Sequence, residues 1–255
     1  MKTPVQIIFT VLVTALMSSS AFAIISFSDD FEGYPIYEGG DATDLGGGWT
    51  YFVNVFGNFA ACDSYLYGYG PGPTPNGPNI SNIVAGSNGN ALNVFSNYGD
   101  DQHANGNCLE TNVFQERIVT GADLGSYTFT FETQVPGDLG TDVQTFGFIK
   151  LIDANNFSTL IFENVSTVTA GAKSISVDLD ATAEGQILQW GFANVASNYL
   201  PSGRWYDNVE FAAAPVVPPV GPNTEGIPIP LWALLGMAGL LAFFGASKLR
   251  AGRKA

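Results

Sequence analysis

Three tyrosines alternate along the stretch "DSYLYGYGPGP" and are the first candidates for binding chemistry. Tyr65, Tyr67 and Tyr69 are two residues apart, so an extended backbone would place their side chains on one face. Flat aromatic rings can stack on the C–H face of a sugar, while nearby amides and carboxylates bond its hydroxyls. The alternative is a loop whose tyrosines pack against the edge of the domain.

Residue sets typical of catalysis are weak in this sequence. Its single histidine, His103 in "GDDQHANG", has no partner at a catalytic or metal-ligating spacing. The sequence contains no GxSxG, HExxH or P-loop motif. Two of its carboxylates could stand at the separation that glycosidases use, but spacing selects no pair. We therefore expect no catalytic residues.

The elements that must position these residues read as β-strands. "SYTFTFETQV" alternates apolar and polar residues and predicts a strand with Phe129, Phe131 and Thr133 on one face. "TFGFIKLI" and "STLIFENV" flank "DANNF", whose Asp and Asn residues favour a turn. Further strands are expected at "FSDDFE", "WTYFVNVF", "NALNVFSN", "NVFQERIV", "KSISVDL", "ILQWGFANV" and "RWYDNVEF".

This pattern predicts an all-β fold, a β-sandwich of jelly-roll type over residues 24–211. No long amphipathic helix is expected in that region. Trp190 and Trp205 lie in apolar strands and are expected in the core. The Pro- and Gly-rich residues 68–79 are expected to form a long surface loop.

The charge of the chain limits its partners. All 23 acidic residues lie between residues 24 and 226, where the only cations are Arg117, Lys150, Lys173 and Arg204. Phosphate binding requires Lys and Arg, so nucleic acid is excluded as a partner. A carboxylate-rich surface favours solubility and divalent cations.

Both ends of the chain are hydrophobic. Residues 1–23 carry Lys2, an apolar stretch and then Ala21 and Ala23, which predicts a signal peptide cleaved after Ala23. The alternative is an uncleaved membrane helix. The uncharged segment from Ile227 to Ser247 is long enough to cross a bilayer as one transmembrane helix. The cations after it place the body on the far side of the membrane.

The C-terminal segment, residues 227–255, resembles the PEP-CTERM type of bacterial sorting tail. The Pro-rich residues 212–226 would be a spacer before it. The resemblance implies transient membrane insertion, cutting by an exosortase-type protease, and delivery to the cell surface or extracellular matrix. A permanent membrane anchor is the alternative. The sorting motif is "IPIPLW", a variant without the Pro-Glu-Pro core, in which the matching positions are Ile227, Pro228, Pro230 and Trp232.

The two cysteines, Cys62 and Cys108, are expected to pair, because an exported body of this size meets an oxidising compartment. The bond would close a loop of about 47 residues and contribute roughly 4 kcal/mol to stability. A reactive thiol is the alternative.

Several segments, in their order along the chain, resemble bacterial carbohydrate-binding modules of jelly-roll fold. They are "DDFEGY", Trp49, "SNGNALNV", "LGSYTFTFETQV" and "YDNVEF". Concanavalin-like lectin domains share "DANNF" and "DNV". The resemblance implies a structural Ca²⁺ between the first and last strands, at positions matching Glu32 and Asp207, with Asp30 as a further ligand. Alternatively, these residues are polar strand ends.

Together these observations predict an exported, non-catalytic protein that binds polysaccharide at the bacterial surface or in the matrix. Two alternatives remain: a structural protein of a biofilm or surface layer without a discrete ligand, and a glycan hydrolase or lyase.

Overall fold

The computed structural model describes residues 25–36, 47–57, 62–73, 80–96, 107–137, 139–140, 143–197 and 202–215. The predicted signal peptide, most of the spacer, His103, and the tail with Ile227, Pro228, Pro230 and Trp232 lie outside them. In this part of the chain no helix has the length and apolar character needed to span a membrane.

The described residues form twelve β-strands and two one-turn 3-10 helices, η1 (Gly121–Asp123) and η2 (Ala181–Ala183). The strands are β1 (Phe27–Asp29), β2 (Thr50–Phe56), β3 (Tyr65–Pro73), β4 (Ser81–Ala85), β5 (Asn90–Val94), β6 (Cys108–Ile118), β7 (Gly125–Gln134), β8 (Val143–Ile152), β9 (Thr159–Ser166), β10 (Gly171–Leu179), β11 (Ile187–Ala196) and β12 (Arg204–Ala213).

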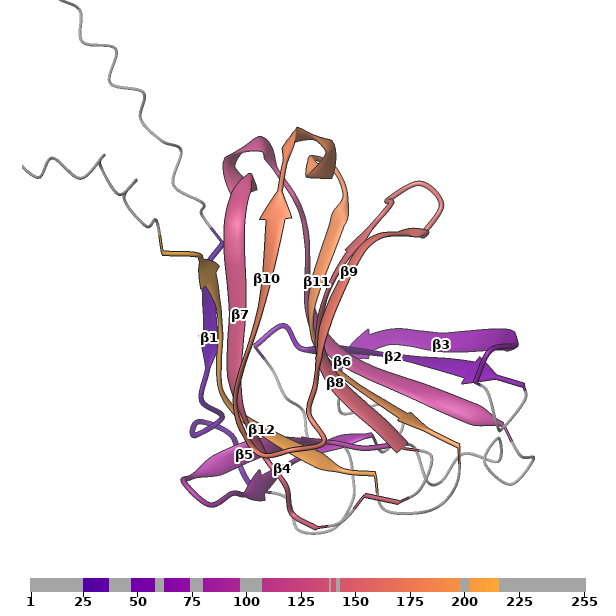
Figure 1. Ribbon diagram of the computed structural model, residues 1–255, viewed down its shortest axis with the longest axis vertical. Coiled ribbons are helices and arrows are strands. Elements are labelled where there is room, and N and C mark those ends of the chain that lie inside the picture. The colour runs from indigo at the N-terminus through magenta and orange to yellow at the C-terminus, as the bar shows by residue number, and fades with distance from the viewer. Residues whose placement is uncertain are drawn as a thin grey trace, which may run out of the picture. The chain divides into compact units, whose positions relative to one another are not determined.

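These strands form two six-stranded sheets that pack face to face (Figure 1). Sheet A has the order β10-β7-β12-β5-β4, with β1 also paired to β12. Sheet B has the order β3-β2-β6-β11-β8-β9. From β5 onward the chain crosses between the sheets at nearly every connection, as in a jelly roll. The predicted all-β sandwich is confirmed.

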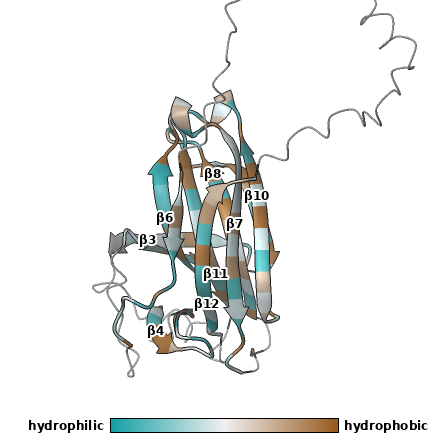
Figure 2. Cartoon of the chain, turned by 90° about the vertical axis from the view of Figure 1, so that its left-hand side faces the viewer, coloured by the Kyte–Doolittle hydropathy of each residue, from teal (hydrophilic) through white to brown (hydrophobic). Residues whose placement is uncertain are grey.

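Alternation along the strands sorts side chains between the core and the outer faces. On β7, Phe129, Phe131 and Thr133 are buried, as predicted, while Thr130 and Glu132 between them are partly exposed. Figure 2 shows the same alternation as bands of opposite hydropathy along β10. Each sheet therefore buries one face and presents the other to solvent.

Stacked aromatic rings join the two sheets across the core. Trp190 of β11 stacks on Phe211 of β12 with ring centroids 4.5 Å apart, and Phe192 stacks on Tyr206 at 3.7 Å. All four side chains are buried. Burying a large apolar side chain contributes about 1.5–3 kcal/mol, so these pairs are a major source of cohesion between the sheets.

Two strands differ from the sequence-based expectation. β4 was not predicted, and β3 occupies the first half of the expected surface loop at residues 68–79. β3 pairs only with β2, so it is an edge strand. Because an edge strand leaves one side of its backbone unpaired, it tolerates Pro71 and Pro73, which read as loop signals in the sequence.

One of the two strand tryptophans, Trp205, also differs from the expectation. Trp190 is 4% exposed and lies in the core as expected. Trp205 is only partly buried, because β12 turns its neighbour Tyr206 inward and Trp205 therefore points to the outer face of sheet A. β12 continues to Ala213, within the first residues assigned to the spacer.

The last residue of the 3-10 helix η1, Asp123, has a buried carboxylate. Asp123 is 1% exposed and accepts two hydrogen bonds of 2.9 Å from the guanidinium of Arg117. Its Oδ2 also accepts from the backbone N–H and the hydroxyl of Thr120, at 2.9 and 2.7 Å. Burial alone would raise the pKa of Asp123, but the hydrogen bonds from Thr120 and the charge of Arg117 outweigh it and lower that pKa.

We expect Asp123→Ala to lower the free energy of unfolding by about 2–3 kcal/mol at neutral pH, because it leaves Arg117 and Thr120 without their acceptor. Since the folded-state pKa is lowered, this contribution is present above the ordinary pKa of Asp and lost as pH falls below it. Urea unfolding at pH 7 and at about pH 2 measures the difference.

The matched control is Asp180→Ala, which removes the exposed N-cap of η2 and should cost clearly less than Asp123→Ala. An equal loss in both variants, or a loss at Asp123 that does not depend on pH, contradicts the assignment.

Candidate functional site

The three tyrosines of β3 lie on two different faces of sheet B. β2 pairs Tyr67 with Val55 but Tyr65 with Phe56, so the register shifts by one residue between them. Val55 points into the core, and Phe56, the next residue, points outward. Tyr65 therefore lies on the outer face, whereas Tyr69 packs against the core. The expectation of one shared face is wrong, because it assumed a regular strand.

Tyr65 is the exposed aromatic ring at this edge of the outer face. It is 57% exposed, and its ring lies 5.9 Å from that of Phe56 in an edge-to-face arrangement. A Cβ on Gly68 would come within 2.5 Å of the Phe52 ring and 3.2 Å of the Tyr65 hydroxyl. The glycine thus leaves room for both aromatic side chains to lie across β3.

A polar network occupies the middle of the same outer face. Glu110 Oε1 accepts hydrogen bonds from the side-chain amides of Asn54, at 3.0 Å, and Asn112, at 2.9 Å. The ammonium of Lys150 lies 3.7 Å from the same oxygen and donates to Asn112 Oδ1 at 3.2 Å. We call these four residues the central network. The second oxygen of Glu110 makes no hydrogen bond to a described residue.

Lys150 reaches the network by crossing a neighbouring strand. It stands on β8 and Asn112 on β6, with β11 between them. At the crossing β11 presents only Gly191 and Ala193 to the outer face. The ammonium lies 4.5 Å from the Phe148 ring centre. Burial outweighs the charge of Glu110 and lowers the pKa of Lys150. The network holds one acidic and one basic side chain, Glu110 and Lys150.

Phenylalanines surround the central network. Phe114 and Phe148 are buried on the outer side of sheet B, with Phe146 packed against them. Phe162, on the edge strand β9, is 44% exposed and lies 5.9 Å from Phe146. The face therefore has an exposed ring near each edge, Tyr65 and Phe162, separated along the sheet by five strand spacings, roughly 24 Å.

Sequence reasoning did not identify the central network. Its members come from β2, β6 and β8, so only the order of strands in sheet B brings them together. One signal was present: Lys150 is a cation within the apolar run "FGFIKLI" of a chain with only nine Lys and Arg residues.

The three carboxylates expected at the calcium site share one neighbourhood. Asp207, on β12, is 2% exposed, while Asp30 and Glu32 are exposed in the turn after β1. Burial raises the pKa of Asp207, a 2.7 Å hydrogen bond from the Asn208 N–H opposes it, and the charges of Glu132, Glu32 and Asp30 raise it further. Glu132 is a member that the sequence did not indicate.

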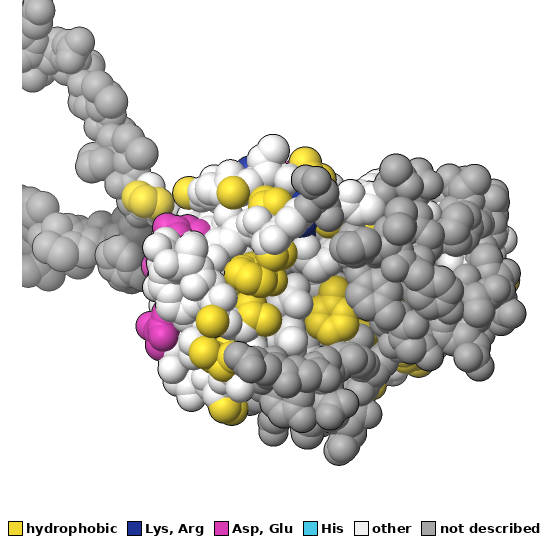
Figure 3. All heavy atoms as spheres, turned by 90° about the horizontal axis from the view of Figure 1, so that it is seen from below, with side chains coloured by type: hydrophobic (Ala, Val, Ile, Leu, Met, Phe, Trp, Pro, Cys, Tyr) yellow, Lys and Arg dark blue, Asp and Glu magenta, His cyan; other side chains and the backbone are white. Residues whose placement is uncertain are grey.

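The described carboxylates nevertheless do not form a closed metal centre. Within the described ranges, no group of three His, Cys, Asp or Glu side chains is arranged to hold a metal ion. Glu32 Oε1 accepts from the Asn90 N–H at 2.9 Å, and Asp30 Oδ1 accepts from the Glu32 N–H at 3.2 Å. Seen from below, acidic side chains gather on the side where β1 and β7 lie, apart from the central hydrophobic group (Figure 3).

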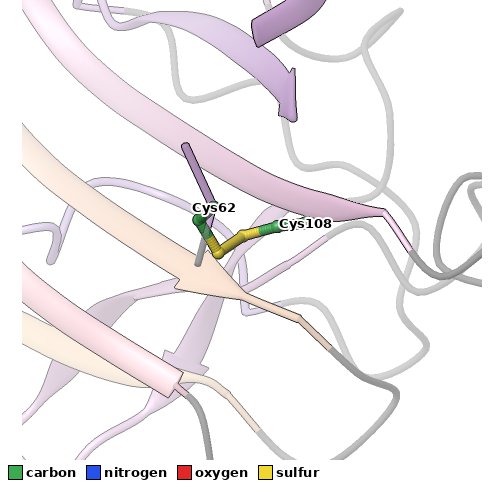
Figure 4. Close-up of a disulfide and its surroundings, with 2 residues drawn as sticks. All are labelled: Cys62 and Cys108. Atoms are coloured by element: carbon green, nitrogen blue, oxygen red, sulfur yellow. A yellow bond between two sulfur atoms is a disulfide. The ribbon is translucent and has the colours of Figure 1, made fainter. Parts of the chain in front are cut away.

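The predicted disulfide is present. Cys62 and Cys108 are bonded, with their Cα atoms 5.4 Å apart, as Figure 4 shows. The bond ties the segment just before β3 to the first residue of β6. Since β2 separates those strands in sheet B, the bridge holds the start of β3, including Tyr65, against the sheet.

We expect the double variant Cys62→Ala, Cys108→Ala to lose about 4 kcal/mol of unfolding free energy, because its unfolded chain is no longer restricted by the closed loop. Urea unfolding with and without a phosphine reductant measures this loss. Reductant should destabilise the wild-type chain and leave the double variant unchanged. The expectation is contradicted if reductant frees both thiols of the wild-type protein, as thiol titration would show, and the urea midpoint stays unchanged.

Comparisons with known proteins identify no family. No protein-family model matches the chain, and no curated protein matches it. Among solved structures, one of the carbohydrate-binding modules from the β-sandwich superfamily is 11% identical, with a TM-score of 0.38, covering 72% of this chain and 62% of that chain.

Two further structures are similar at the same level. The C-terminal family 22 carbohydrate-binding module of Clostridium thermocellum Xyn10B is 13% identical, with a TM-score of 0.37, covering 78% of this chain and 97% of that chain. The Stig cyclase Fisc from Fischerella sp. TAU is 14% identical, with a TM-score of 0.36, covering 74% and 100%. None of these similarities identifies a ligand or a reaction for this chain.

Proposed function

We propose that this chain is a non-catalytic polysaccharide-binding protein and that its binding surface is the outer face of sheet B. The observation that carries the proposal is an exposed ring near each edge of the face, Tyr65 and Phe162, with the central network between them. Aromatic rings bind the C–H faces of sugars, and amides and carboxylates bond their hydroxyls.

The charge of the central network favours a neutral polysaccharide. Glu110 and Lys150 compensate each other, so a neutral sugar meets no unbalanced charge in the central network. The open oxygen of Glu110 can accept from one hydroxyl, and Lys150 can donate to another. The sheet is wide enough for several rings of an extended chain.

We further propose that the protein is exported to the bacterial surface or matrix. The signal-peptide pattern, the Pro-rich spacer and the PEP-CTERM-like tail support export, transient membrane insertion and processing by an exosortase-type protease. The bonded Cys62 and Cys108 also favour this location, because disulfides persist in oxidising compartments.

We expect Tyr65→Ala and Phe162→Ala each to weaken binding of a neutral polysaccharide by roughly tenfold, since each removes one stacking platform. A glycan array on the purified protein selects the polysaccharide, and calorimetry measures its affinity.

Tyr67→Ala is the matched control, because the register shift turns Tyr67 to the opposite face from Tyr65. The proposed binding face is contradicted if Tyr67→Ala loses as much affinity as Tyr65→Ala, or if Tyr65→Ala loses none. A protein that binds nothing on the array favours the alternative of a structural matrix protein without a discrete ligand.

We also propose a structural Ca²⁺ beside Asp207, with Glu32 and Asp30 as further ligands. Support comes from the buried carboxylate of Asp207 in a field of three other carboxylates, whose repulsion a divalent cation would relieve. Ca²⁺ takes six to eight oxygens, so backbone carbonyls and waters would complete its shell.

Asp207→Asn should melt at a higher temperature than wild type in EGTA at neutral pH. The raised folded-state pKa means that Asp207 contributes stability at low pH, below its ordinary pKa, and loses it as pH rises and the carboxylate ionises. Added Ca²⁺ should then raise the melting temperature of wild type and leave Asp207→Asn unchanged. Calorimetric melting tests both; a wild-type midpoint that millimolar Ca²⁺ does not move would sink the calcium site.

A further inference from the structure

A groove on the outer face of sheet A lies on the opposite side of the sandwich from the central network. Its volume is about 360 Å³. Its walls include Trp205 of β12, Glu132 and Gln134 of β7, Ser87 of the β4–β5 turn and Gly171 at the start of β10.

Trp205 provides the flat surface of this groove. It pairs with Gln134 of β7 and Asn93 of β5, and it is partly exposed. Gly171 leaves the β10 side of the groove open, because a Cβ at this position would meet nothing within 4 Å. Trp205 thus lines an open hollow.

Two polar side chains of β7, Gln134 and Glu132, line the groove. Gln134 Oε1 accepts hydrogen bonds from the N–H and the hydroxyl of Ser87, at 2.8 and 3.0 Å, which fixes the orientation of the amide. Its Nε2 is buried and has no hydrogen-bond partner among the described residues. The amide of Gln134 is therefore a fixed part of the groove wall.

Glu132 is the second such group. It stands two residues from Gln134 on the same face of β7, and it makes no hydrogen bond or ion pair to a described residue. Glu132 pairs in the sheet with Asp207 of β12. Lys173 of β10 donates to the Thr169 hydroxyl at 3.0 Å and forms no ion pair with Glu132.

From these contacts we infer that the groove is a second carbohydrate site and that it takes a sugar bearing a free amine. The sugar ring stacks on Trp205, and its ammonium pairs with Glu132. A neutral sugar leaves Glu132 unpaired, and a uronic acid is repelled by it. This assignment is independent of the binding proposed on sheet B, because the two faces share no residue.

Two sites on opposite faces allow one domain to hold two glycan chains at once. The faces also differ in charge: the central network of sheet B is balanced, whereas the groove of sheet A is acidic. One domain therefore joins a neutral chain to an amine-bearing one.

Calorimetry with a β-linked glucosamine tetramer, and with its fully N-acetylated counterpart, tests the inference on the purified protein. We expect the free-amine tetramer to bind more tightly than the acetylated one. Trp205→Ala should weaken that binding at least tenfold, and Glu132→Gln should weaken it severalfold and remove its dependence on salt. Glu132→Gln keeps the shape of the side chain, so it reports on charge even if Trp205→Ala is destabilised.

Tyr65→Ala is the control for the other face and should leave tetramer binding unchanged. The inference is overturned if the protein does not bind the tetramer, or if Trp205→Ala and Glu132→Gln both bind it like wild type. It is also overturned if Tyr65→Ala abolishes the binding, which would place the tetramer on sheet B. Loss of neutral polysaccharide binding in Tyr65→Ala, with tetramer binding intact, supports both sites separately.

Discussion

The stacking of Trp190 on Phe211 and of Phe192 on Tyr206 sets the register of the whole sandwich. These rings stand on β11 and β12, which lie in the interior of sheets B and A. Because these rings point into the core, the residues next to them along each strand must point outward. Gly191 lines the path of Lys150 for this reason, and Trp205 borders the acidic groove for the same reason.

Features that depend on local alternation could be predicted from the sequence. β7 with its buried Phe129 and Phe131 is one example, and the hairpin around "DANNF" is another. Pairing of Cys62 with Cys108 followed from there being only two cysteines in a chain predicted to be exported. In each case neighbouring residues or simple counting carried the information.

Other features depend on contacts between distant segments and could not be predicted. The shift that turns Tyr65 away from Tyr67 arises in the pairing of β3 with β2, and nothing within "YLYGYGPGP" shows it. Glu110 and Lys150 stand on strands that are separated by β11. They can meet because β11 has only small side chains at that point. Trp205 sits in "RWYDNVEF", where apolar residues occur on both faces, so hydrophobicity alone assigned it to the core.

The pairing of the first strand with the last one has a mechanical consequence. Phe27 of β1 lies opposite Phe211 of β12, and β12 is flanked by β7 on its other side. A protein held to the cell through the chain that follows Ala213, and pulled through a bound glycan, would be loaded along β12. The hydrogen bonds on both sides of that strand would then be strained together in shear rather than opened one by one. Resistance to such a load is governed by the rate of unfolding, and this topology places β12, which is paired on both sides, on the line of tension.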